Sequence, residues 1–503
     1  MSGVQADQRV SVESKPYEDR KEMLDDDVDR HYAVEIPQIL KDVGPEEQGR
    51  IDRRVTRKID MLLMPPLVIL FILNFLDRNN VSTAKVGGMT EDLRMSGQEF
   101  STVVAVLFAG YISLQVPSNM IASRVKWPSF YICCMTAAWG TVSACTGAVN
   151  NYHGLLVCRL ILGFTEAAFF PGALFLLSLF YTKRQIAFRT AILYSGSQLG
   201  NAFGGLFAMA CLQLDGTHKL EGWRWLFIIE GAMTVGFSLI FATFIPNRPE
   251  TCRSFTDAER AQAVYRLQLD RATKDASSEM SIGTATKLVF TDPKVYLIMI
   301  ALTVNFIASA VTNFFPVVIR EMDPDYSKIQ SLGMTAPPYV LCVITIWIMG
   351  YWSDRIQRRT IFVVISMAFN VLANIIAVAT TNVGARYFAM MLMPASFYTS
   401  STIILSWMSS TIVGPDIKKA TAFALINAVA NTSNIWTSYL YFGAPRYVVA
   451  FGVNLGASVV VILLILVLAG YLSRLNKKLD NGQSLGKNGP TDVQIEGGFR
   501  FQI

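Results

Sequence analysis

Long apolar segments recur along the sequence and constrain its fold more than any other feature. A helix needs about 20 mainly apolar residues to cross the hydrocarbon core of a bilayer. Of the 503 residues, 52% are hydrophobic and only 16% are charged, whereas soluble domains average about 25% charged residues. We therefore predict an all-α membrane protein in contact with the lipid bilayer. Twelve spans are expected near residues 61–84, 101–121, 128–148, 153–178, 188–212, 224–245, 293–318, 333–352, 361–381, 386–409, 417–442 and 449–472.

Polar segments divide the spans into two groups of six. They predict a disordered N-terminal tail, a first six-helix bundle, a cytosolic linker, a second six-helix bundle and a C-terminal tail, at residues 1–56, 57–245, 246–292, 293–472 and 473–503. In the linker, Ser254 followed by Asp257-Ala-Glu-Arg-Ala indicates a capped amphipathic helix. The first tail lacks the apolar segment of a signal peptide, so we expect the first span to direct membrane insertion.

Lys and Arg residues gather in alternate short loops. They follow the second, fourth, eighth, tenth and last spans, whereas the loops at 147–152 and 380–384 contain none. Because basic loops face the cytosol, both termini are predicted to be cytosolic, and we expect the plasma membrane as the location. These loops hold much of the net charge of +6, which therefore does not indicate a nucleic-acid partner.

A weak internal repeat relates the two groups of spans. The loop after the eighth span has the pattern G-x-x-x-D-R-x-x-R-R, from Gly350 to Arg359, and resembles the short cytosolic loop of the major facilitator superfamily. By that resemblance it is a gating loop, carried by Asp354, Arg355 and Arg358. The matching loop after the second span keeps an arginine but has Ser123 where the aspartate would be. Only the second half is therefore expected to have the full ionic latch.

Four charged residues lie within the first and fourth predicted spans. Asp77 and Arg78 are adjacent in the first span, and Arg159 and Glu166 are seven residues apart in the fourth. Seven residues make two helical turns, so Arg159 and Glu166 share one face. Counted at ~1.5 Å per residue, Asp77, Arg78 and Arg159 lie at similar depth in the outer half of the bilayer, with Glu166 below them. A charge at the centre of a span costs about 2.5–3.5 kcal/mol, so four charges there suggest a function.

Two interpretations of these charges remain open. They could form a buried ion-pair network that holds the first and fourth spans together. Alternatively, a guanidinium group suits the capture of a carboxylate, and a buried acid can carry a proton that a neighbouring arginine opposes. An anion that reaches the arginine would release the acid, and this would couple the anion to a proton.

Other polar residues in the spans suit either hydrogen bonds between helices or the lining of a central cavity. Asn74 shares a helix face with Asp77 and Arg78. The remaining candidates for binding substrate are Tyr194, Gln198, Asn305, Trp407, Asn427 and Asn431. Glu230, a third acid within a span, is expected to pair with a nearby arginine.

Four segments carry a resemblance to a known family. They read RKIDMLLMP, NFLDRNNVSTAKVGGM, RLILGFTEAAFFPGALFLLSLFY and GWRWLFIIEG. These resemble the fungal allantoate permease family, in the anion:cation symporter branch of the major facilitator superfamily, and the similarity runs roughly from Arg57 to Leu472. The resemblance implies two pseudo-symmetric bundles around a central site with alternating access. It also implies uptake of organic anions such as allantoate, nicotinate, pantothenate or biotin, generally with protons.

The resemblance also suggests roles for individual residues. A bacterial sugar-acid symporter of the same branch has an Asp-Arg pair on its first helix and an arginine and glutamate seven apart on its fourth. By analogy, Asp77 and Glu166 would carry protons, Arg78 would bind the anion and Arg159 would modulate the acids. Gln198 and an asparagine of the eleventh span would hydrogen-bond the substrate.

The sequence thus predicts a transporter that imports a small carboxylate with protons. An exporter of an acidic metabolite by proton antiport and a non-transporting nutrient sensor are the alternatives. No phosphate-binding loop, nucleophile elbow or HExxH pattern supports an enzyme. Seven cysteines and three histidines show no metal-binding spacing, so we expect no metal or cofactor. We expect a monomer.

Overall fold

The computed structural model describes residues 37–41, 43–272, 282–323, 325–413, 416–483, 485–490 and 499–503. Within these ranges every regular element is a helix, which confirms the predicted all-α class. Most of the predicted N-terminal tail and part of the linker lie outside the described residues.

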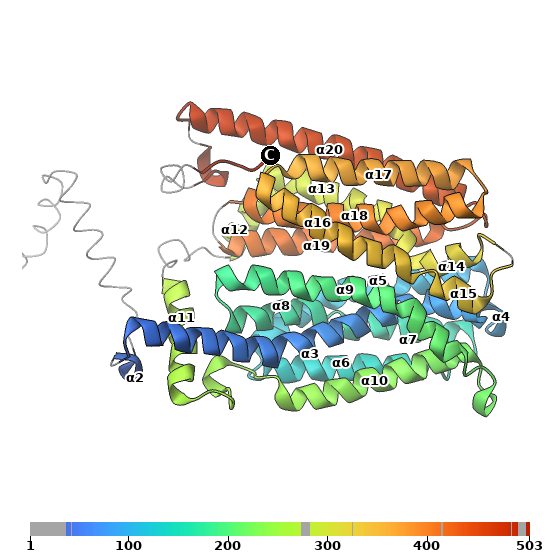
Figure 1. Ribbon diagram of the computed structural model, residues 1–503, viewed down its shortest axis with the longest axis horizontal. Helices are drawn as coiled ribbons and strands as arrows, with labels where there is room; N and C mark the ends of the chain where they lie inside the picture. Colours follow the sequence, from blue (N-terminus) through green and yellow to red (C-terminus); the bar gives the residue numbers. More distant parts are fainter. Residues whose placement is uncertain are drawn as a thin grey trace, which may run out of the picture.

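The first half of the chain forms one group of long helices, in blue to green in Figure 1. They are α3 (Pro45–Gly87), α5 (Gly97–Arg124), α6 (Pro128–Thr146), α7 (Tyr152–Glu166), α8 (Phe169–Phe180), α9 (Lys183–Leu212) and α10 (Gly222–Phe244), with the short α2 (Gln38–Lys41) and α4 (Met89–Asp92). Helix α3 begins at Pro45, so its first twelve residues lie in the region 1–56 that the sequence predicted to be a disordered tail. Pro45 at its start and Glu46 and Glu47 in its first turn are typical of a helix N-terminus.

The second half forms the other group, in yellow to red. It comprises α13 (Pro293–Ala308), η4 (Ala310–Phe314), α14 (Phe315–Arg320), α15 (Lys328–Gly333), α16 (Ala336–Ile356), α17 (Arg359–Ala379), α18 (Val383–Thr411), α19 (Asp416–Thr437), η5 (Ser438–Leu440) and α20 (Val448–Asp480). Each predicted span falls on one helix or on an interrupted series of helices. Nine segments in the described part of the chain are long and apolar enough to cross a membrane. Helices α6, α9 and α19, at the other three predicted spans, are not among them.

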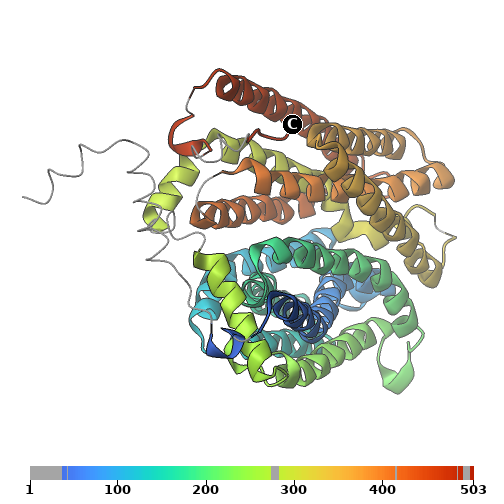
Figure 2. The ribbon, with the colours of Figure 1, turned by 60° about the vertical axis from the view of Figure 1, so that its left-hand side comes forward.

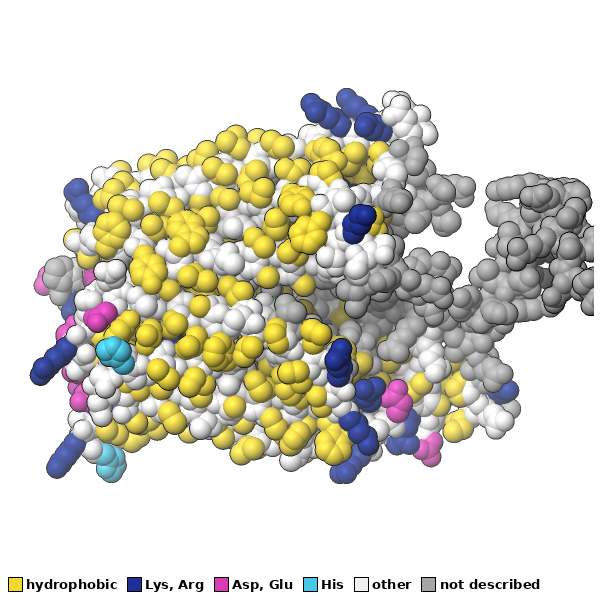
Figure 3. Space-filling model, turned by 180° about the vertical axis from the view of Figure 1, so that it is seen from behind, with side chains coloured by type: hydrophobic (Ala, Val, Ile, Leu, Met, Phe, Trp, Pro, Cys, Tyr) yellow, Lys and Arg dark blue, Asp and Glu magenta, His cyan; other side chains and the backbone are white. Residues whose placement is uncertain are grey.

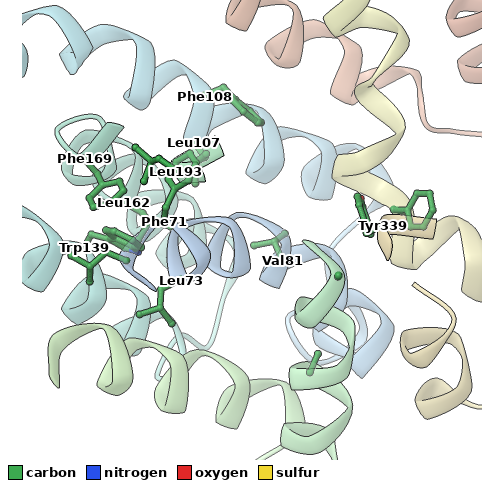
Figure 4. Close-up of a cluster of buried hydrophobic side chains, with 14 of the residues drawn as sticks. Phe71, Leu73, Val81, Leu107, Phe108, Trp139, Leu162, Phe169, Leu193 and Tyr339 are labelled. Carbon is green, nitrogen blue, oxygen red and sulfur yellow. The ribbon is translucent and has the colours of Figure 1, made fainter. Parts of the chain in front are cut away.

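Helix α3 runs through the middle of the first half. Figure 2 places it inside a ring of neighbouring helices, and it packs against both α9 and α10. Leu63, Leu67 and Leu70, spaced by one helical turn, are fully buried. Around Phe71, the rings of Phe169 and Trp139 extend the core (Figure 4). The helix that carries Asp77 and Arg78 is therefore held on several sides.

The outer surface of the helices is apolar. Exposed large side chains include Trp347, Phe244 and Leu463, which are 68%, 64% and 56% exposed. Hydrophobic side chains cover the flanks in Figure 3, whereas charged side chains gather at the two ends. Such a band is unfavourable in water and suits the hydrocarbon of a bilayer.

The two ends of the molecule differ. We call the end that bears α2, α11 (Asp257–Ala272), α12 (Ile282–Phe290) and the C-terminus the tail end, and the end that bears α4 and α15 the opposite end (Figure 1). The predicted amphipathic linker helix is α11. Its capping residue is Thr256 rather than Ser254, because the Thr256 hydroxyl accepts from the amide of Glu259 and the Glu259 carboxylate accepts from the amide of Thr256.

Helix α11 is docked on the tail-end extension of α3. Arg266 forms an ion pair with Asp52 at 3.1 Å and donates to the hydroxyl of Thr56 at 2.7 Å. Lys58 forms an ion pair with Glu259 at 2.7 Å. Burial raises the pKa of Glu259, but hydrogen bonds from Lys58 and Thr256 outweigh it, and the pKa lies below its ordinary value. The contact therefore stays ionic through the neutral and mildly acidic range.

The two halves meet at the opposite end and near the middle. Lys328 donates to the carbonyl of Gly87 at 3.0 Å, and the Lys85 ammonium lies 3.8 Å from the carboxylate of Glu321. Nearer the middle, Asn201 of α9 donates to the hydroxyl of Tyr398 on α18 at 3.3 Å. The first two contacts join the halves at the opposite end, and the third joins them near the middle.

Gly205 on α9 makes this closure possible. A Cβ atom at Gly205 would lie 2.4 Å from the carbonyl oxygen of Leu332 and 1.9 Å from the Thr335 hydroxyl, both in the second half. The carbonyl belongs to the backbone and cannot turn away. We therefore predict that Gly205→Ala opens the opposite end. Electron-spin distance measurements between labels at the exposed positions Arg94 and Asp325, with the native cysteines replaced, should show a longer mean distance.

Gly204→Ala is the matched control. It adds the same methyl group one residue earlier, where no atom lies within 4 Å. It should leave the distance distribution unchanged. Equal distributions for Gly205→Ala and the parent protein would contradict the role given to Gly205.

Candidate functional site

A charged cluster lies between α3 and α7, inside the first half. The Nε of Arg78 forms an ion pair with Oε1 of Glu166, and the amide of Asn74 donates to the same oxygen at 2.6 Å. The Glu166 side chain is 1% exposed and that of Arg78 is 17% exposed. Arg78 is thus the more exposed member of the pair.

Glu166 is the last residue of α7, at a break in the predicted fourth span. Helix α8 starts at Phe169, and Pro171 lies in its first turn. Proline has no amide hydrogen, and its ring would clash with the carbonyl four residues earlier, which here is that of Ala167. The break therefore follows from the sequence and leaves the Glu166 side chain at a helix terminus, facing α3.

Aromatic rings hold the Arg78 guanidinium. Its carbon lies 4.6 Å from the ring centre of Tyr111 on α5 and 5.4 Å from that of Phe75 on α3. A guanidinium over an aromatic face is stabilised by about 0.5–2 kcal/mol. These ring contacts are independent of the Glu166 carboxylate.

Asp77 faces a different helix from Arg78, although the two are adjacent in the sequence. It is 1% exposed. Its two oxygens accept hydrogen bonds from Nε1 of Trp139 at 2.5 Å and from the hydroxyl of Ser143 at 2.8 Å. Trp139 and Ser143 are four residues apart on α6 and so lie on one face. We missed both in the sequence, because a Trp and a Ser in a helix that is apolar all round do not show which neighbour they face.

Arg159 binds backbone rather than carboxylate. Its Nη1 and Nη2 donate to the carbonyls of Asp77 and Arg78 at 3.4 and 3.5 Å. The residue is 2% exposed, and its Nε is buried with no hydrogen-bond partner among the described residues. The four charged residues of the two spans therefore do meet, through one ion pair and two carbonyl contacts.

The polar candidates of α9 lie near the junction of the halves. Gln198 donates to the hydroxyl of Ser197 at 3.2 Å and accepts from the thiol of Cys342 on α16 at 3.7 Å. Tyr194 is 37% exposed, and its ring centre lies 5.3 Å from that of Phe170. Asn201, which bonds Asn79 at 2.6 Å as well as Tyr398, is a further polar contact at this junction.

In the second half, the expected asparagines make contacts within that half. Asn305 is fully buried and donates to the hydroxyl of Ser401 at 2.6 Å. Asn431 donates to the carbonyl of Asn427 at 2.8 Å, one turn earlier on α19, and both are half-buried. Asn305 therefore joins α13 to α18, whereas Asn427 and Asn431 bond along one helix.

Trp407 lies elsewhere, at the tail end. It is 1% exposed, and its Nε1 donates to the carbonyl of Gln502 at 2.9 Å. The expectation that Trp407 lines a substrate cavity is wrong, because its polar edge is used by the C-terminal segment 499–503. The side chain of Asn476 on α20 exchanges two hydrogen bonds of 2.9 Å with the backbone of Phe501, which is 3% exposed.

The predicted gating loop lies beside this segment. Asp354 forms an ion pair of 2.6 Å with Arg359, the first residue of α17. Arg355 donates to the hydroxyl of Tyr351 at 3.1 Å, and Arg358 precedes α17 as its capping residue. Arg359 also contacts the Gln502 side chain at 3.4 Å. The C-terminal segment therefore connects the loop to α18 and α20.

In the described part of the chain, cavities lie between the two halves. A cavity of about 520 Å³ lies at the opposite end and is lined by charged residues that include Lys85, Glu321 and Lys328. A much smaller one, of about 10 Å³, lies deeper, beside Asn79, Asn201 and Tyr339. The described residues therefore leave little space around Asn79 and Asn201.

Two groups of long apolar helices define the class of protein as a polytopic membrane protein. Comparison with known proteins agrees: residues 67–437 match the model of the Major Facilitator Superfamily. The chain belongs to this superfamily and is a multi-pass membrane transporter.

Named relatives and solved structures fit this assignment. An uncharacterized transporter of Schizosaccharomyces pombe is 34% identical over 395 residues, which cover 78% of each chain. The high-affinity nicotinic acid transporter of Saccharomyces cerevisiae is 27% identical over 90% of this chain and 84% of its own. A bacterial homologue of the human lysosomal transporter Spinster, in an inward-facing and occupied conformation, superposes with a TM-score of 0.62 at 15% identity, over 85% of this chain and 99% of its own. That structural likeness shows the fold.

Loss of the C-terminal contact should destabilise the second half. Truncating a buried aromatic side chain costs about 3–5 kcal/mol, so Phe501→Ala should clearly lower the temperature of unfolding of the purified protein in detergent. Arg500→Ala is the control, because the ion pair of Arg500 with Asp480 is exposed on both sides and such pairs contribute about 0–1 kcal/mol. Equal unfolding temperatures for the two variants would contradict the docked segment.

Proposed function

We propose that the protein imports a small organic anion together with protons, and that Arg78 binds the carboxylate of that anion. The observation that carries the proposal is the ion pair between Arg78 and Glu166, with Asn74 on the same oxygen. An internal carboxylate occupies the arginine where a substrate carboxylate would bind. The charges of the cluster are buried, so the added negative charge of a substrate carboxylate changes the electrostatic energy of the cluster strongly.

The coupling follows from competition for one cation. A substrate carboxylate accepts hydrogen bonds from Arg78 and displaces Oε1 of Glu166. Without its cation, Glu166 is a buried carboxylate that keeps only the neutral donor Asn74, and burial then favours its protonated form. Glu166 takes up a proton. The loaded cluster then has the same net charge as the empty cluster, because the negative charge of the substrate and the positive charge of the proton cancel. The transporter then exposes the site to the other side, where both leave.

The other charged residues position this pair. We propose that Arg159 fixes the backbone of α3 at Asp77 and Arg78, since it donates to both carbonyls. Hydrogen bonds from Trp139 and Ser143 stabilise the Asp77 carboxylate and hold α3 against α6. In this proposal Glu166 is the acid that the substrate carboxylate displaces from Arg78. Asp77 is affected by that displacement because it lies on α3 next to Arg78. Gln198 and Tyr194, on α9, are proposed to contact the body of the substrate.

The substrate class is proposed from the chemistry of the site and from resemblance. A guanidinium with aromatic neighbours suits a carboxylate joined to a planar or polar body. The relative in Saccharomyces cerevisiae is named a nicotinic acid transporter, and the sequence resembles the allantoate permeases. Nicotinate and allantoate are therefore the first compounds to test.

We propose that the protein lies in the plasma membrane. In the proposed orientation the tail end faces the cytosol. Basic residues of the loops support this orientation. The closed opposite end then corresponds to a state shut toward the outside, and Gly205 and the Lys85–Glu321 pair belong to the outer closure. The gating loop at Asp354, Arg355 and Arg358 is proposed to control closure at the cytosolic end.

Two substitutions separate binding from coupling. Arg78→Ala should abolish both uptake and exchange of radiolabelled carboxylate, because the cation that binds it is gone. Glu166→Gln removes the exchangeable proton but keeps size and hydrogen bonding, so exchange of labelled for unlabelled substrate should persist while accumulation driven by a pH gradient is lost. Both are measured in proteoliposomes with nicotinate, allantoate and related carboxylates, at acidic and neutral external pH.

Arg50→Ala is a matched control, because Arg50 pairs with Glu47 on the tail-end extension of α3, where both side chains are more than half exposed. It should leave uptake within a factor of about two of the parent protein, as for surface ion pairs. Accumulation of substrate against its gradient by Glu166→Gln would rule out the coupling role of Glu166. Outward transport driven by an inward proton gradient would favour the export alternative.

A further inference from the structure

Glu230 is a buried acid that the proposed cycle does not use. It lies on α10, near the middle of the span Gly222–Phe244, and is fully buried. The side-chain amide of Asn80 on α3 donates to its Oε2. Its Oε1 is buried and has no hydrogen-bond partner among the described residues. The sequence led us to expect that Glu230 pairs with an arginine, and that expectation is wrong: in the described part of the chain its one bonded partner is neutral.

The surroundings of Glu230 are tightly packed. The neighbouring Gly231 lies so close to α6 that a Cβ atom would be 2.5 Å from the carbonyl oxygen of Gly140 and 2.5 Å from the amide of Ala144. Among the described residues, the charged or titratable groups that interact with Glu230 are Asp77 of α3, Arg159 of α7 and Cys211 of α9. Asp77 opposes a negative charge on Glu230. Arg159 favours one, but its bonds go to the α3 carbonyls instead.

A carboxylate in such a place is costly. Burying a charge without a pairing cation is far more unfavourable than burying the neutral acid, and groups in this position take up a proton instead. The adjacent negative charge of Asp77 acts in the same direction. Asn80, one turn after Asp77 on α3, suits the neutral acid equally well, because the carbonyl oxygen of a protonated carboxyl group still accepts its hydrogen bond.

We propose that Glu230 is a proton-binding site, separate from the substrate cluster, and that it holds a proton on Oε1 in this conformation. Arg159 lies among Asp77, Glu166 and Glu230. A shift of its guanidinium toward Glu230 would stabilise the carboxylate and release the proton. This second step, which rests on the proposed function, makes Glu230 a store that keeps its proton while substrate binds and gives it to the solvent after the site has opened to the other side. Binding of the proton itself requires no transport.

The proton can be observed directly. Infrared spectroscopy of the purified protein should contain the carbonyl stretching band of a protonated, non-aqueous carboxyl group at neutral pH, and Glu230→Gln should remove it. Glutamine has the same size and can still accept from Asn80, so its unfolding temperature should match that of the parent protein. Identical carboxyl bands in the parent protein and in Glu230→Gln would overturn the proposal.

A second variant guards against a folding defect in the first. Asn80→Ala removes the donor to Oε2 and leaves Glu230 in place, so the same band should remain and move to higher frequency. An unshifted band in Asn80→Ala would overturn the assignment to Glu230. Neither measurement involves transport, so both stay informative if the proposed symport fails.

In the transport assay, Glu230→Gln should retain exchange of nicotinate or allantoate and lower pH-driven accumulation at least about tenfold, the effect of ~1.4 kcal/mol. Unchanged accumulation would overturn the release step alone.

Discussion

The ion pair between Arg78 and Glu166 joins the two helices whose relative position the first half depends on. It links the middle of α3 to the end of α7, where Pro171 interrupts the fourth span. In a dry interior such a pair is held strongly, and removing one partner leaves an uncompensated charge. That makes the pair a suitable element for a transporter: it is stable when closed and can be opened only by a group that replaces the partner or by a proton that neutralises it. The cluster therefore connects a chemical event at one arginine to the packing of α3.

The surrounding structure supports this pair on each side. Arg159 holds the carbonyls of α3, and Trp139 and Ser143 hold the carboxylate of Asp77. Asn80 extends the polar face of α3 to Glu230 on α10. Helices α6, α7 and α10 thus contact about two turns of α3 through polar groups, whereas Leu63, Leu67, Leu70 and Phe71 bury the preceding turns. A movement at Arg78 cannot stay local, because the same helix also carries Lys85 to the closed interface with Glu321.

Much of this arrangement could be read from the sequence. Apolar runs located the helices, and the seven-residue spacing of Arg159 and Glu166 placed them on one face, toward the first span. The rotational setting of α6 could not be read, because its apolar residues are distributed around the helix, so Trp139 and Ser143 were missed. Trp407 was assigned to a cavity because polar and aromatic residues in a span suit one. Its real neighbour, Gln502, is 95 positions further along the chain, and no local pattern indicates such a contact. Likewise, the sequence did not indicate whether Glu230 pairs with an arginine or with an asparagine, because the packing of α3 against α10 decides it.

The central claim is that a substrate carboxylate takes Arg78 from Glu166 and that Glu166 then binds a proton. The most direct test is the proton count on binding, measured as the pH change when a transported carboxylate is added to the purified protein in weakly buffered solution. The account predicts uptake of about one proton for each carboxylate bound, by linkage of the two equilibria, with no uptake in the variant that lacks the Glu166 acid. Binding of the carboxylate to the parent protein without any proton uptake would contradict it.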